Sequence, residues 1–157
     1  MKKIIANTFT PIYDEIEDRI RLVINYQDLN NRVDLMITRA FILNLIPATD
    51  EFIMTHFPED GLYEETPSIN TIKPTNFDSE KNLSKTDGIN LELYKTDEEL
   101  LREVNFSHNI KNKITTIKFS TNKTITIANL DYNMLKQITK TIKSSLPYFK
   151  WGISSNF

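Results

Sequence analysis

The sequence contains no cysteine, and it has only three glycines and two histidines among 157 residues. The missing thiols exclude a disulfide framework, thiolate catalysis and any cysteine-ligated zinc or iron–sulfur site. The few glycines leave little room for a glycine-rich phosphate loop, and no serine lies in a GxSxG context. His56 and His108 form neither an HExxH motif nor a paired metal spacing, so both are predicted to be structural. No catalytic residue, metal site or cofactor is therefore predicted.

Long apolar runs are missing as well. The longest apolar stretch, residues 40–46, is far shorter than the roughly 18–20 residues of a membrane span. The charged start of the chain is followed by only three apolar residues, whereas a signal peptide needs about 7–15. We therefore expect no membrane association, and the lack of cysteine suits a cytoplasmic protein. Heavy use of isoleucine, asparagine, lysine and threonine suggests a low-GC bacterial or phage gene.

Charge is strongly segregated along the chain, although the net charge is only −2. Residues 1–49 are neutral overall. Residues 50–108 carry fourteen acidic and five basic side chains, a net charge of −9. Residues 109–157 carry eight lysines and one aspartate, a net charge of +7. One hypothesis is that the acidic segment folds over the basic block and screens it until a partner displaces the acids.

Residues 19–57 are predicted to form a hairpin followed by a kinked helix. Apolar and polar residues alternate over residues 19–26, which is typical of a half-buried strand, and a second strand is expected over residues 33–37. Thr38 stands where a helix N-cap belongs, and apolar residues then recur at helical spacing. Pro47 lies inside this pattern, so it should kink the helix or split it in two.

Residues 58–97 are predicted to be a flexible acidic segment. Apolar residues are sparse there, and prolines and glycines interrupt the sequence. A stretch of about 40 residues without regular structure is too long for an ordinary loop. Within it, residues 89–94 could form a short strand, and residues 96–99 resemble a helix start or a turn.

Residues 100–157 are predicted to form a basic block of strands and one helix, followed by an aromatic tail. Strands are expected over residues 101–108, 114–119 and 123–128. Asp131 can cap a helix over residues 132–146, whose buried stripe would contain Leu135, Ile138, Ile142 and Leu146.

Together these patterns predict a single α+β domain spanning residues 1–157. Its antiparallel strands would form two groups, a hairpin with its helix and three strands with theirs. A long flexible acidic insert would separate the two groups.

The basic block contains the best candidates for a binding surface. Lysines that share one helix face could hold phosphates, and nearby aromatic rings could stack on bases. The candidates are Lys111, Lys113, Lys118, Lys123, Lys136, Lys140, Lys143, Tyr148, Phe149 and Trp151. In the alternative interpretation, the lysines are only the polar face of an amphipathic helix. The aromatic residues would then close the core or anchor a protein partner.

Acidic residues cluster at three places, residues 14–18, 64–65 and 97–99. Paired carboxylates can hold Mg²⁺ or transfer protons, but such sites need rigid strands and these clusters lie mostly in loop-like segments. They are predicted to be solvated loops.

The sequence therefore favours a non-catalytic accessory or adaptor protein that acts through protein–protein contacts. Its partner would be another protein chain or a further copy in a homo-oligomer. The alternative is a single-stranded nucleic-acid-binding protein that uses the lysine-rich C-terminal block. A small metal-dependent enzyme comes third.

Overall fold

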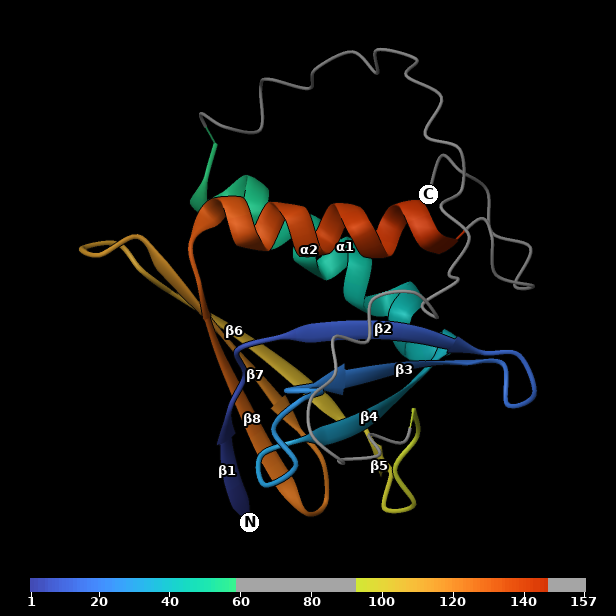
Figure 1. The fold of residues 1–157 in the computed structure, drawn as a ribbon. Coiled ribbons are helices and arrows are strands. Elements are labelled where there is room, and N and C mark those ends of the chain that lie inside the picture. The colour runs from blue at the N-terminus through green and yellow to red at the C-terminus, as the bar shows by residue number, and fades with distance from the viewer. Residues whose placement is uncertain (59–92, 147–157) are drawn as a thin grey trace.

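The computed structural model describes residues 1–58 and 93–146, which form two four-stranded sheets and two helices (Figure 1). Sheet A has the strand order β1-β8-β7-β6, and sheet B has the order β2-β3-β4-β5. The helices are α1 (Arg39–His56) and α2 (Tyr132–Ser145). The strands are β1 (Lys2–Ile5), β2 (Phe9–Asp14), β3 (Arg19–Ile24), β4 (Val33–Thr38), β5 (Glu99–Leu100), β6 (Glu103–Asn109), β7 (Ile114–Ser120) and β8 (Thr124–Leu130).

This arrangement confirms the predicted α+β class. Most of the predicted acidic segment, including nearly all of the possible strand at residues 89–94, lies outside the described residues. The aromatic tail with Tyr148, Phe149 and Trp151 lies outside them too.

Both sheets are mixed, whereas the sequence predicts only antiparallel pairing. β1 pairs with β8 in parallel, with Lys2 opposite Thr124, and β5 pairs with β4 in parallel, with Glu99 opposite Leu35. The other neighbouring strands are antiparallel. The first strand of the chain thus completes the sheet built by the last strands. This pairing leaves no local pattern in the sequence.

The helix caps are confirmed. The Thr38 side chain accepts a hydrogen bond from the Phe41 amide, and the Asp131 side chain accepts one from the Met134 amide. Pro47 does not split α1, which is one continuous helix. Its position on the exposed face of the helix leaves room for water near the carbonyl that loses its donor.

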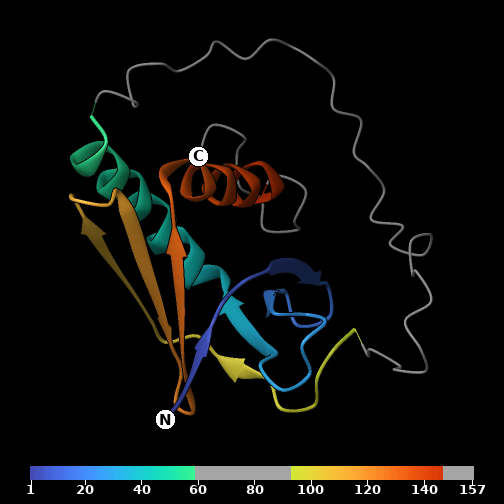
Figure 2. The same ribbon diagram turned by 60° about the vertical axis from the view of Figure 1, so that its left-hand side comes forward.

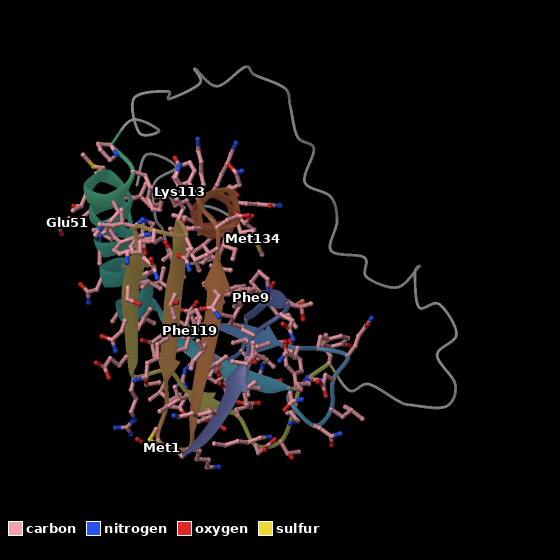
Figure 3. All side chains as sticks on the ribbon, turned by 90° about the vertical axis from the view of Figure 1, so that its left-hand side faces the viewer. Met1, Phe9, Glu51, Lys113, Phe119 and Met134 are labelled. Atoms are coloured by element: carbon pink, nitrogen blue, oxygen red, sulfur yellow. The ribbon has the colours of Figure 1, made fainter. Side chains whose placement is uncertain are left out.

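One hydrophobic core includes side chains from both sheets and both helices, among them Leu22, Leu35, Ile42, Ile117 and Leu135. α2 packs on β7 and β8, and α1 packs on β6. Both helices lie on the same side of sheet A (Figure 2). No described element covers the other face of sheet A, which is turned toward the viewer in Figure 3.

The strand predicted over residues 19–26 is confirmed as β3, but the prediction that it is half buried is wrong. β3 is buried on both faces, because Arg21 is only 3 % exposed and Val23 is fully buried. β4 is similar, with Asp34 and Met36 buried beside its apolar face. Apolar and polar residues do alternate along these strands, but the face that carries the polar residues Arg21 and Asp34 is buried as well. They have charged partners, which are described below.

Candidate functional site

The candidate lysines are spread over the molecule. Lys111 and Lys113 lie in the turn between β6 and β7, whereas Lys123 lies in the turn between β7 and β8, at the other end of sheet A. In Figure 3, Lys113 lies near one end of the sheet and Met1 near the other, and the Lys2 amide donates to the Lys123 carbonyl. Lys118 is exposed in the middle of β7. The structure does not bring these four side chains together.

The three lysines of α2 lie on a different part of the surface, and two of them have intramolecular partners. The Lys143 Nζ is 2.6 Å from the Asp50 Oδ2 of α1. The Lys136 ammonium lies 5.9 Å from the centre of the Tyr132 ring. Lys140 is exposed. Lys143 therefore contributes to packing between the helices.

The strands at the sheet edges differ in how well they are protected against pairing with another chain. Natural edge strands are usually short, or carry lysine or proline, because their unpaired backbone groups can bind a further strand. β1 has four residues including two lysines, β2 contains Pro11, and β5 has two residues. β6 has seven residues and contains no proline, lysine or arginine. Among the described strands, β6 is therefore the one long edge without these protections.

The register shows which backbone groups of β6 point outward. In the β7–β8 turn, the Thr121 amide donates to the Thr124 carbonyl at 3.0 Å, so alternate residues of β7 from Thr121 backward bond to β8. The intervening residues of β7 bond to β6, opposite Asn105 and Ser107. The amides and carbonyls of Val104, Phe106 and His108 therefore face the open edge of β6.

The side chains of these same three residues are only half buried. They point to the inner side of sheet A, where their neighbours on β7, Ile117 and Phe119, are buried. Phe106 also contacts Phe52 of α1, with ring centres 5.2 Å apart. A strand from another molecule that paired with β6 here would satisfy the outward-facing backbone groups of β6. It would also cover the half-buried side chains of the same residues.

Two histidines meet at this edge. The rings of His56, at the end of α1, and His108, on β6, have centres 5.3 Å apart. Phe52 contacts His56 at 4.5 Å and Phe57 contacts His108 at 4.7 Å. The Nδ1 of His108 is 3.3 Å from the Thr115 Oγ1. Both histidines were predicted to be structural and independent of each other, because nothing local in the sequence links position 56 to position 108.

A second group of polar side chains lies on the face of sheet B that points away from the hydrophobic core, and it has a structural role. The buried Arg21 guanidinium is 3.3 Å from Asp14, forms an ion pair with Glu98, and lies 4.2 Å from the centre of the Tyr94 ring. Burial alone would lower the pKa of Arg21, but Glu98 and Asp14 hold it above its ordinary value. Hydrogen bonds from the backbone amides of Glu17 and Ile16, together with Arg21, lower the pKa of Asp14 against the opposing effect of burial. Asp14 and Glu98, predicted to belong to solvated acidic loops, thus pair with Arg21.

Arg32 and Asp34 form a neighbouring buried pair. The Arg32 Nε and one terminal nitrogen lie 2.8 and 3.0 Å from the two Asp34 carboxylate oxygens. Arg32 also donates to the Leu93 carbonyl, and the Lys95 amide donates to Asp34. These bonds fasten residues 93–95 to sheet B. Because the charges are satisfied by fixed partners, we assign them to stability and not to chemistry.

Other sites have less support. Within residues 1–58 and 93–146, no group of three or more histidine, aspartate or glutamate side chains could hold a metal ion. An open depression is lined by Thr10, Tyr26 and Asp28, but the amide of Asn25 beside it is fully used by backbone partners. No helix in the described part of the chain is long and apolar enough to cross a membrane.

Comparison with protein-family models, curated proteins and solved structures finds no match to this chain. The fold class by itself does not specify a function. The residues of the site are therefore what indicates the function of this chain.

Proposed function

We propose that this chain is a non-catalytic accessory protein that binds another protein, and that an extended segment of that partner pairs with the open edge of β6. The observation that supports the proposal is the seven-residue edge of β6, which contains no proline, lysine or arginine and pairs with no further strand among the described residues. Backbone pairing at such an edge is a common way to bind peptides, because it supplies hydrogen bonds for any sequence.

The side chains of β6 define what the partner segment should look like. Val104 and Phe106 lie on the inner face, and Asn105 and Ser107 are exposed on the outer face. A partner strand with apolar residues at alternate positions would extend the inner apolar surface and turn its polar residues to solvent. Each backbone hydrogen bond formed would contribute roughly 0.5–1.5 kcal/mol net.

A different protein fits this edge better than a second copy. Paired strands lie about 4.8 Å apart, whereas packed helices need about 8–10 Å between their axes. α1 packs directly on β6, through Phe52 and Phe106 among other contacts. A two-fold pairing of β6 with β6 would place two copies of α1 on the same side of the joined sheet, each packed on one of the two paired edge strands, where they would compete for space. A single extended segment has no such helix.

Single-stranded nucleic acid is the alternative partner, and it has weaker support. A bound strand needs a continuous track of cations for its phosphates. Lys111 and Lys113 lie at one end of sheet A and Lys123 at the other, and Lys143 is paired with Asp50. The described lysines do not form one track.

The proposal is tested by removing one outward-facing backbone donor. Val104→Pro removes an amide hydrogen at the open edge, and proline is tolerated where that hydrogen faces solvent. Val104→Ala is the matched control, because it loses the side chain and keeps the amide. The probe is a peptide selected from a random display library on the immobilised full chain. We expect Val104→Pro to bind it about tenfold more weakly than Val104→Ala does.

Equal binding by the two variants, with both folded by circular dichroism, would contradict the proposal. Hydrogen exchange on the unmodified chain gives a second measurement. The amides of Val104, Phe106 and His108 should exchange faster than those of Asn105 and Ser107, and slow exchange at all five would show that the edge is already covered. A dimer in light scattering that Val104→Pro dissociates would replace the foreign partner with a second copy. A salt-dependent gel shift with single-stranded DNA, unchanged in Val104→Pro, would favour the alternative.

A further inference from the structure

The two histidines of this chain are its only imidazoles, and the fold places them in contact. His56 ends α1 and His108 lies on β6, with ring centres 5.3 Å apart and ring planes 41° apart. The Phe52 ring contacts His56, and the Phe57 ring contacts His108. His56 is exposed, so the pair is accessible from solvent.

The separation of the rings matches that of two imidazoles on one metal ion. A zinc–nitrogen bond of about 2.0–2.1 Å places the centre of a bound imidazole ring about 3.2 Å from the metal. Two such rings at a tetrahedral angle have centres about 5.2 Å apart. The observed separation of 5.3 Å between the ring centres allows both rings to bind one ion once a nitrogen of each faces it.

The surroundings of His108 favour the same role. Its Nδ1 lies 3.3 Å from the Thr115 hydroxyl oxygen, which is buried within sheet A. When a histidine donates one ring N–H to a fixed oxygen, the other nitrogen keeps its lone pair and its direction is set. With Thr115 as that acceptor, Nε2 of His108 is the nitrogen available to a metal.

We propose that His56 and His108 bind one divalent transition-metal ion of the zinc, copper or nickel type, with water filling the other positions. Imidazole nitrogen suits these metals, whereas Mg²⁺ and Ca²⁺ prefer oxygen ligands. Two protein ligands and an exposed position make this an exchangeable site. The proposal does not depend on the strand-binding function of β6.

The test is titration of the full chain with ZnCl₂ by calorimetry. We expect one ion per chain, unaffected by a large excess of Mg²⁺, and binding at least about tenfold weaker in both His56→Ala and His108→Ala. Thr115→Val should weaken binding by about tenfold, because it removes the acceptor that orients His108. Thr116→Val is the matched control: its hydroxyl bonds Asn129 on the other face of sheet A, so zinc affinity should not change.

A spectroscopic measurement on the unmodified chain covers the case in which a histidine variant fails to fold. The electron paramagnetic resonance spectrum with one equivalent of Cu²⁺ should show coupling to two imidazole nitrogens. Coupling to one imidazole or none would overturn the proposal. Zinc affinity that is unchanged in His56→Ala would overturn it as well, because the ion would then be held by other groups.

Discussion

Replacing Glu98 by glutamine tests how the buried charge on β3 is stabilised. Arg21 is 3 % exposed, and it depends on Glu98, Asp14 and the Tyr94 ring for compensation. Removing one partner of a buried ion pair typically costs about 3–5 kcal/mol. Here Asp14 remains, and the Glu98 side chain is 29 % exposed. We therefore expect Glu98→Gln to lower the free energy of unfolding by about 2–3 kcal/mol.

Removing the arginine itself should cost less. Arg21→Met places an apolar side chain in the same buried position, and the carboxylates of Asp14 and Glu98 can both reach water. We expect a loss of about 1 kcal/mol, partly from the lost contact with Tyr94. The double variant should then be no less stable than Arg21→Met alone, because Glu98 has no charge left to neutralise.

Urea denaturation of the three variants, followed by circular dichroism, measures these differences. Additive losses in the double variant, or a larger loss for Arg21→Met than for Glu98→Gln, would refute the reasoning. Additive losses would mean that Glu98 stabilises the fold independently of Arg21. A larger loss for Arg21→Met would mean that the guanidinium group, with its two carboxylate partners and its contact with Tyr94, contributes more than Glu98 alone.

Two further predictions concern single residues. The pKa of Asp14 is lowered in the folded chain, so its contribution to stability is present above the ordinary aspartate pKa and is lost as the pH falls through the folded value. Asp14→Asn should therefore flatten the fall in urea midpoint between about pH 5 and pH 2, and an unchanged slope would show that Asp14 does not contribute. Pro47→Ala should raise the free energy of unfolding by about 1–2 kcal/mol, because Pro47 lies on the exposed face of α1 and alanine restores a helical hydrogen bond. A lower melting temperature in calorimetry would show instead that the helix needs the proline.

The helices and the central strands could be predicted from the sequence because their signals are local. Thr38 and Asp131 cap helices at the predicted positions, and the strands of sheet A other than β1 begin within about two residues of the predicted starts. β1 could not be predicted, since its four residues are recognisable as a strand only through their pairing with β8. The burial of Arg21 could not be predicted for a related reason, because its ion-pair partner Glu98 lies far along the chain.

The candidate site shows the same limit. The abundance of lysine in residues 109–157 can be read from the sequence, but it does not show whether those lysines lie on one surface. The edge of β6 and the histidine pair both depend on topology: which strand is left unpaired, and which helix end lies above it. The absence of proline and lysine from residues 103–109 is visible in the sequence, but its meaning requires knowing that this strand is an edge.

The parallel pairing of β1 with β8 has a consequence for synthesis on the ribosome. Sheet B and α1 can begin to form once the first third of the chain has emerged, except for β5. β1 must wait until residues 124–127 have been made, because the partner of Lys2 is Thr124 and the partner of Ile5 is Ile127. During that interval Ile4 and Ile5 have no strand to pair with. Nascent chains stalled before residue 124 should therefore depend on chaperones more than chains that contain all of β8, since long-range pairing is the slow part of folding.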